Sequence, residues 1–137
     1  MIELSNVSFS YNRSERPVLH DISFTVDKGE FVVLSGSTGT GKSTIIKLLD
    51  RQLSAGSGVV RVNGIDLGSL GRSAVAKYRR SIGCVLQDLN LLEDRTVGEN
   101  LAFAMEVQGN RTSANKRDVI ASTLERVGVH CDLNAFP

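Results

Sequence analysis

The stretch that decides the fold is GSTGTGKST at residues 36–44, which follows EFVVLS at 30–35 and precedes IIKLLDRQL at 45–53. Its two outer glycines, its lysine and the serine after the lysine fit the pattern G-x-x-x-x-G-K-[ST]. From average residue usage, a match arises by chance in about 0.5% of chains of this length. The apolar run before it and the helical spacing after it complete the context of a phosphate-binding loop (Walker A motif).

Each residue type in this stretch suits a phosphate ligand. Glycines let the backbone adopt left-handed angles and approach a ligand closely, so that exposed N–H groups form an anion nest at the start of a helix. Lys42 is expected to reach the β and γ phosphates, the Ser43 hydroxyl to bind Mg²⁺, and Thr44 to hydrogen-bond the α phosphate. The expected phosphate-binding residues are Gly36, Ser37, Thr38, Gly39, Thr40, Gly41, Lys42, Ser43 and Thr44.

Alternation of apolar and polar residues predicts two strands before the loop. In IELSNVSFSY, residues 2–11, the alternation changes phase near Ser5 and Asn6, which indicates a β-bulge. The run HDISFTV at 20–26 alternates again. These segments are expected to form an antiparallel pair with one face toward water.

Two apolar runs without alternation predict strands buried on both faces, as in parallel sheets. They are EFVVLS at 30–35 and IGCVLQ at 82–87. Between them, residues 56–67 predict a short strand, a turn at Asn63 and Gly64, and a strand end. Helical spacing predicts helices at 45–53, 73–80, 96–108 and 113–127.

Composition predicts one soluble intracellular domain. The chain has 137 residues, 41% hydrophobic content and a net charge of +1, which gives no reason to expect nucleic acid as a partner. No run approaches the ~18 apolar residues of a membrane span, and the N-terminus does not resemble a signal peptide. Cys84 and Cys131 lack metal-type spacing and are expected to be reduced thiols.

Two further residues connect the loop to a family. Tyr11, in SYNRSERPVL, and Gln87, in GCVLQD, match the adenine-stacking aromatic and the Q-loop glutamine of ATP-binding-cassette (ABC) nucleotide-binding domains. The chain therefore resembles the N-terminal part of such a domain. The resemblance implies an α/β fold of the P-loop NTPase class, with ATP and Mg²⁺ as ligands and both Ser43 and Gln87 at the metal.

That resemblance also implies how the chain is organised. Residues 1–137 would form the N-terminal part of one nucleotide-binding domain, with an antiparallel β segment and an incomplete parallel core sheet. Its parts would be the β segment at 1–29, the loop strand and helix at 30–53, the Q-loop region at 82–108 and a helix at 113–127.

Within the family, YRRSIGCVLQDLNLLEDRTVGENLAFAMEVQG is most similar to the cell-division subunits of the FtsE type, although Leu86 and Gly98 replace a usual phenylalanine and tyrosine. This similarity implies a role in bacterial cell division. ATP would drive an FtsX-like membrane subunit, contacted through residues 88–108, that controls cell-wall hydrolases. It also implies a second copy of the nucleotide-binding domain and a peripheral location on the inner face of the cell membrane.

The 137 residues contain no LSGGE signature, no Walker B pair of acids and no switch histidine. Because phosphoryl transfer to water needs a metal clamp and a residue that orients the water, these residues are expected not to hydrolyse ATP alone. Strands of the family's sheet would also be missing between 30–35 and 82–87. The exposed strand edges are expected to favour aggregation, partial disorder or domain swapping.

Three alternatives remain open from the sequence. The chain could be a naturally short, non-hydrolytic nucleotide-binding module that regulates a partner, or part of a lipoprotein-exporting or macrolide-exporting ABC ATPase. The third alternative, a phosphate-loop kinase of small substrates, agrees poorly with the β segment before the loop and with the pattern around Gln87.

Overall fold

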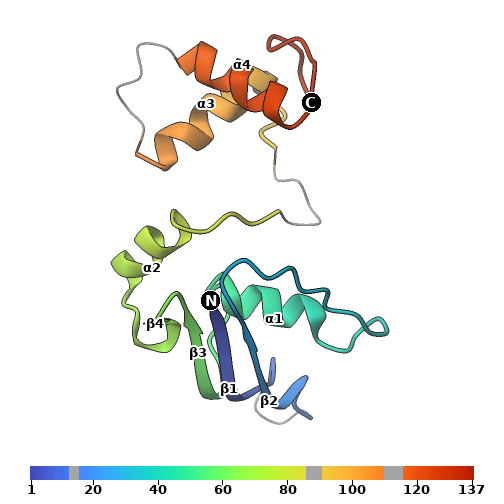
Figure 1. Ribbon diagram of the computed structural model, residues 1–137, viewed down its shortest axis with the longest axis vertical. Coiled ribbons are helices and arrows are strands. Elements are labelled where there is room, and N and C mark those ends of the chain that lie inside the picture. The colour runs from blue at the N-terminus through green and yellow to red at the C-terminus, as the bar shows by residue number, and fades with distance from the viewer. Residues whose placement is uncertain (13–15, 86–90, 110–115) are drawn as a thin grey trace. The chain divides into compact units, whose positions relative to one another are not determined.

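The computed structural model describes residues 1–12, 16–85, 91–109 and 116–137. They form two compact units, Met1–Gly83 and Cys84–Pro137 (Figure 1). The phosphate loop lies in the first unit, and the second unit is helical.

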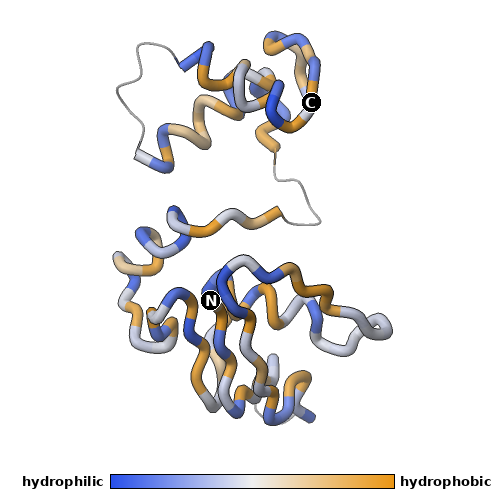
Figure 2. The backbone as a smooth tube through the Cα atoms, in the orientation of Figure 1, coloured by the Kyte–Doolittle hydropathy of each residue, from blue (hydrophilic) through white to orange (hydrophobic). Residues whose placement is uncertain are grey.

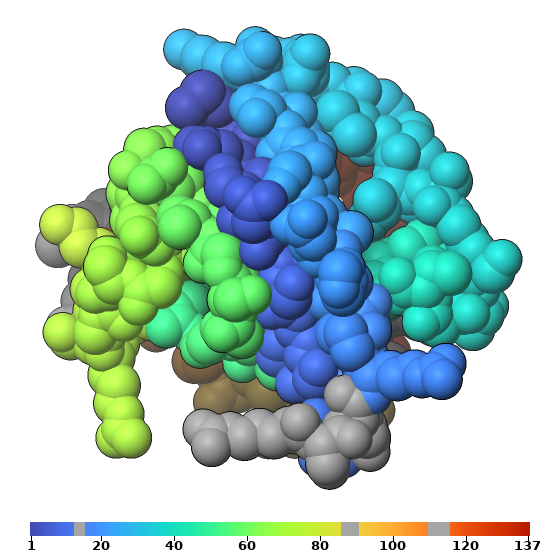
Figure 3. Space-filling view, turned by 90° about the horizontal axis from the view of Figure 1, so that it is seen from below, coloured from blue at the N-terminus to red at the C-terminus, as the bar shows by residue number. Residues whose placement is uncertain are grey.

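The first unit contains a four-stranded sheet in the order β2-β1-β3-β4. All pairs are antiparallel, and Figure 3 shows β3, β1 and β2 side by side. The turn predicted at Asn63 and Gly64 is confirmed, since both have positive φ, 50° and 79°, as a tight hairpin turn requires. The strands are β1 (Ile2–Phe9), β2 (Leu19–Val26), β3 (Ser57–Val62) and β4 (Ile65–Asp66).

The predicted bulge in β1 is also confirmed. Pairing with β2 shifts register between Leu4 and Val7, and Asn6 has a φ of 51°. The bulge is held by two bonds from Asn6: its backbone N–H donates to Ser23 Oγ and its side-chain amide donates to Asp21 Oδ1, both at 2.8 Å. The phase change in the sequence therefore marks a real change in which side chains face the core.

One face of the sheet packs against α1 (Lys42–Leu49), which contributes Ile45 and Leu48 to the core. The opposite face is polar, and there Glu3 and Arg61 form a cross-strand ion pair at 3.3 Å. The alternation of apolar and polar residues predicted that β1 and β2 form an antiparallel pair with one face toward water, and the structure confirms this. The buried hydrophobic cluster of the first unit comprises Leu4, Val7, Phe9, Leu19, Ile45, Leu48, Val60, Val62, Leu67 and Tyr78.

The end of α1 is capped by side chains of α2 (Arg72–Arg79), which follows the short 3-10 helix η1 (Leu67–Ser69). The buried Tyr78 hydroxyl donates to the Leu49 carbonyl. Arg79 donates to the carbonyls of Asp50, at 2.9 Å, and Arg51, at 3.1 Å. The final carbonyls of a helix have no partner within the helix, so these bonds fasten α2 to the loop helix.

The two predicted buried strands are wrong for the residues that the structure describes. Residues 30–35 have no regular secondary structure and pair with no described strand, and Phe31 is 92% exposed. Residues 83–85 form no strand either, and Val85 is also 92% exposed. Figure 2 shows the run before the loop as a continuous hydrophobic stretch of backbone. The incomplete parallel sheet is therefore not formed within the described ranges, because an apolar strand needs a neighbour to pair with.

A hollow of about 340 Å³ lies beside this unpaired segment. Phe24 of β2, Leu34 of the segment and Ile45 of α1 contribute to its wall. Apolar surface that would be buried by a neighbouring strand is thus open to water in this unit.

The second unit contains α3 (Val97–Val107) and α4 (Lys116–Arg126), joined by an ion pair between Lys116 and Glu106 at 2.6 Å. Thr96 and Glu99 form a capping box at the start of α3: each side chain accepts the backbone N–H of the other, at 3.2 and 2.8 Å. Neither these helices nor any other in the described ranges is long and apolar enough to cross a membrane.

Gly98 lets the segment after α4 approach the start of α3. The backbone N–H of Gly98 donates to Leu133 O and that of Val97 to Ala135 O, both at 2.8 Å. A Cβ on Gly98 would lie 3.1 Å from Leu133 O. A side chain at this position would therefore crowd the Leu133 carbonyl.

Candidate phosphate-binding site

The loop at residues 36–41 ends where α1 begins, and Gly41 makes that junction. Gly41 is the N-cap of α1 in the left-handed conformation, with a φ of 93°. It is buried against the chain that leads into β2: a Cβ there would lie 2.7 Å from Leu19 Cδ2 and 3.2 Å from the Val18 carbonyl. Only glycine suits both the angle and the space. In the sequence, Val18 and Leu19 look like ordinary strand residues, so their contact with Gly41 could not be predicted from it.

The start of α1 presents backbone donors that have no acceptor within the helix. The first intrahelical bond runs from the Ile45 N–H to the Gly41 carbonyl at 3.0 Å, and no described side chain caps this end. The N–H groups of Lys42, Ser43 and Thr44 precede that bond and have no acceptor in the helix. With the positive end of the helix dipole, they form a site that favours an anion.

Lys42 folds back over the loop. Its ammonium donates to the carbonyls of Gly36 and Ser37, both at 2.7 Å. Thr40 Oγ1 also donates to Ser37 O, at 2.9 Å, which closes the loop as a turn. The cation therefore lies at the loop itself, beside the unpaired amides of α1, where it can exchange carbonyl oxygens for phosphate oxygens.

The structure brings Tyr11 to this loop. Its hydroxyl lies 3.2 Å from Thr44 Oγ1, although the residues are 33 positions apart. The Phe9 ring meets the Tyr11 ring edge-on, with centroids 5.0 Å apart, and Tyr11 is 53% exposed. An aromatic ring with a free face beside a phosphate site can stack on a base.

The proposed metal site is described only in part. Ser43 is exposed at the start of α1, and its hydroxyl is a hard oxygen donor of the kind Mg²⁺ accepts alongside phosphate oxygens. Gln87 lies outside the described residues. Within the described part, no group of three or more His, Cys, Asp or Glu side chains could hold a metal, so a metal here would rely on Ser43 and ligand oxygens.

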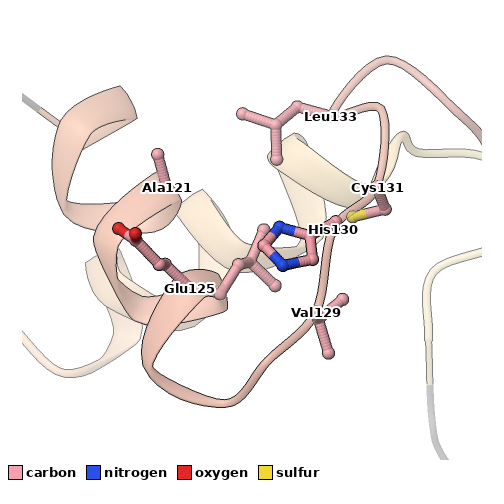
Figure 4. Close-up of a pocket in the computed structure, with 7 residues that line it drawn as sticks. Ala121, Glu125, Val129, His130, Cys131 and Leu133 are labelled. Carbon is pink, nitrogen blue, oxygen red and sulfur yellow. The ribbon is translucent and has the colours of Figure 1, made fainter.

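A separate hollow of about 390 Å³ lies in the second unit. Figure 4 shows Ala121 and Glu125 on α4, and His130 and Cys131 on the segment that follows. Cys131 and Cys84 are both free and exposed. None of the described residues in its wall is a lysine or arginine, in contrast to the phosphate loop with Lys42.

Comparison with known proteins identifies the family. A family model described as ABC transporter matches residues 19–135. The cell division ATP-binding protein FtsE of Mycobacterium tuberculosis is 46% identical over 137 residues, which is all of this chain and 59% of that protein. FtsE of Haemophilus influenzae is 37% identical over 138 residues, covering 62% of its length.

Other members are similar as well. The methionine import ATP-binding protein MetN of Caulobacter vibrioides is 35% identical over the whole chain, covering 41% of its length. A solved dimeric ATP-binding cassette in a post-hydrolysis state, bound to ADP and Pi, has a TM-score of 0.88 at 26% identity, covering all of this chain and 62% of that one. The chain thus spans 41 to 62% of the lengths of these proteins.

Proposed function

Because the chain belongs to the ABC transporter family, we propose that residues 36–44 bind the phosphates of ATP together with Mg²⁺. The observation that carries this proposal is that the Lys42 ammonium lies on the loop from which α1 begins, where three amides have no acceptor within the helix. Lys42 lies over the loop, and the N–H groups of Lys42, Ser43 and Thr44 have no partner in α1. This arrangement offers positive charge and directed donors to the same anion.

Each group then has a distinct task. The amides and Lys42 hold the β and γ phosphates, Ser43 supplies an oxygen to Mg²⁺, and Thr44 bonds the α phosphate. Bound Mg²⁺ neutralises charge on the phosphate chain. The exposed ring of Tyr11 stacks on the base, and Gln87 completes the metal site.

A titration of MgATP into the chain, followed by calorimetry, tests this function. The wild type is expected to bind, and Lys42→Ala is expected to lose at least about tenfold in affinity, because the lost bond is to a charged group. Lys47→Ala is the matched control, since Lys47 is an exposed lysine on the same helix, outside the loop. Equal affinity for wild type and Lys42→Ala would reject the site.

We further propose a role in bacterial cell division. Two FtsE proteins align with the whole chain, at 46% and 37% identity. Two copies would hydrolyse ATP and drive an FtsX-like membrane subunit that controls cell-wall hydrolases, and this subunit would hold the protein at the inner face of the cell membrane. A dimer is supported by the dimeric relative bound to ADP and Pi.

The contact with the membrane subunit is proposed for residues 88–108, of which 91–108 are described. In this range α3 has no buried residue, although its sequence VGENLAFAMEV is mostly apolar. Phe103 and Val107, one turn apart, are 45% and 49% exposed. The Arg95 guanidinium lies over the Phe103 ring, 5.3 Å from its centroid, but both apolar side chains remain about half exposed. An exposed apolar helix face suits docking by another helix.

The similarity to MetN makes methionine import the second candidate function. A photo-cross-linking residue at position 103 of the full-length protein in its own cells would decide between them. Capture of an FtsX-like subunit supports cell division, whereas capture of an import permease supports the alternative. The same probe at Thr25, an exposed residue of β2, is the control for non-specific capture.

A further inference from the structure

Tyr11 has a hydroxyl beside the phosphate site in addition to its exposed ring. Thr44 is 4% exposed, and within the described residues its hydroxyl bonds one side chain, the Tyr11 phenol at 3.2 Å. The ring that carries this hydroxyl is held through Phe9. It meets the Phe9 ring edge-on, and the Val18 N–H donates to the Phe9 carbonyl at 2.8 Å, which closes the chain beside Gly41.

The proton count on these hydroxyls sets the direction of the bond. Each hydroxyl has one proton to donate and two lone pairs that accept. Without a ligand, either oxygen can be the donor. A phosphate oxygen can only accept, so Thr44 must give its one proton to the phosphate. The bond between Tyr11 and Thr44 then survives only if Tyr11 donates.

We propose that Tyr11 is a positioning residue for the phosphate chain: its phenol donates to Thr44 Oγ1 and so aims the Thr44 proton at a phosphate oxygen. The inference rests on the proposed function of residues 36–44. Hydrogen bonds in such a chain polarise and strengthen one another. The phenol therefore contributes to binding even when the ligand has no base.

This role differs from stacking in a way that can be measured. Stacking uses the ring face, which Tyr11→Phe retains together with the contact to Phe9. The hydroxyl acts through Thr44, and Tyr11→Phe removes it. A ligand without a base, inorganic tripolyphosphate, reports on the hydroxyl alone.

The test is calorimetric titration of MgATP and of magnesium tripolyphosphate into wild type, Tyr11→Phe, Thr44→Val and the double variant. Tyr11→Phe is expected to weaken both ligands by the same factor, about 2- to 12-fold, the range of one net hydrogen bond. The double variant is expected to bind no more weakly than Thr44→Val, because both changes break one chain of bonds. Tyr78→Phe, which removes the other tyrosine hydroxyl at the far end of α1, should leave both affinities unchanged.

Unchanged or tighter tripolyphosphate binding by Tyr11→Phe would overturn the inference, and so would additive losses in the double variant. Circular dichroism of each variant shows whether it has kept its fold. Failure of the proposed function gives a different result: wild type would bind neither ligand, or Lys42→Ala would bind both as tightly as wild type.

Discussion

Gly41 and Leu19 approach so closely that a Cβ on the glycine would lie 2.7 Å from Leu19 Cδ2. This contact joins the end of the phosphate loop to the first residue of β2, and Leu19 is itself almost completely buried. The shape of the loop therefore depends on the antiparallel sheet before it. The sheet supports the anion site through Leu19, and Tyr11 follows its strand β1.

Substitution of Gly41 tests this support. Gly41→Ala is expected to destabilise the first unit by about 2–4 kcal/mol, because alanine strains a left-handed backbone and collides with Leu19. Gly39→Ala is the matched control: Gly39 has a φ of 84°, but a Cβ there meets nothing within 4 Å. It should cost about 1–2 kcal/mol. Chemical denaturation without nucleotide measures both, and equal losses would contradict the packing argument.

A second pair of glycines, Gly58 and Gly64, tests how tightly the bulge in β1 is packed. Gly58 and Gly64 have nearly the same φ, 80° and 79°, but a Cβ on Gly58 would lie 2.3 Å from the Asn6 carbonyl oxygen, whereas Gly64 faces open space. Backbone atoms cannot rotate away, so Gly58→Ala is expected to cost at least about 3 kcal/mol. Gly64→Ala should cost about 1–2 kcal/mol. Thermal unfolding followed by circular dichroism compares the two, and similar melting temperatures would show that the bulge rearranges at low cost.

Acid is expected to weaken the start of α3. The hydrogen bond from the Thr96 backbone N–H, and next that from its hydroxyl, lower the pKa of Glu99 below its ordinary value of 4.5. A lowered pKa means that the folded state favours the carboxylate form of Glu99. The carboxylate therefore stabilises the folded state fully above pH 4.5, and this stabilisation is lost as the pH falls through the pKa of the folded state. Helicity should therefore decrease in this acidic range.

Glu99→Gln provides the comparison, because glutamine can accept the same bond but does not titrate. Amide signals of residues 97–107, followed by NMR from pH 6 to pH 2, should show an acid transition in wild type that is reduced in the variant. If both proteins show the same transition, other carboxylates control the helix.

The unpaired segment before the loop predicts self-association. Phe31, Val32, Val33 and Leu34 are 92, 55, 72 and 42% exposed, and an extended apolar segment with free backbone groups pairs readily with another chain. Size-exclusion chromatography of the 137-residue chain should give a mass above 14.8 kDa. Val33→Lys should shift it toward the monomer, whereas Val127→Lys, at a valine 67% exposed in the second unit, should not. A monomeric wild type at high concentration would contradict this prediction.

Local patterns predicted the local structure well. The phase change at Ser5 and Asn6 indicated the bulge because side-chain alternation records which face of a strand is buried. The turn at Asn63 and Gly64 followed from the backbone angles that these residue types tolerate. Apolar spacing predicted a helix at 45–53 after the glycine loop, and a helix is found there, but α1 begins earlier, at Lys42, and ends at Leu49.

Burial that depends on residues distant in the sequence was predicted less well. The run at 31–34 predicted a buried strand, but burial needs neighbouring strands, and none lies beside it in the described part of the chain. The predicted helix at 113–127 behaves similarly: Ile120 is buried in α4, whereas Val119 and, just after the end of α4, Val127 are exposed. The bond between Tyr11 and Thr44 depends on how a hairpin packs against a helix, which no local pattern records.

The most direct test of the central claim is the response of the loop amides to MgATP, measured by two-dimensional NMR of the ¹⁵N-labelled chain. If the phosphates bind where the structure offers free donors, the largest shifts will fall on residues 39–44, and Lys42→Ala will abolish them. Shifts confined to the second unit, or the same shifts in the variant, would contradict phosphate binding at the start of α1.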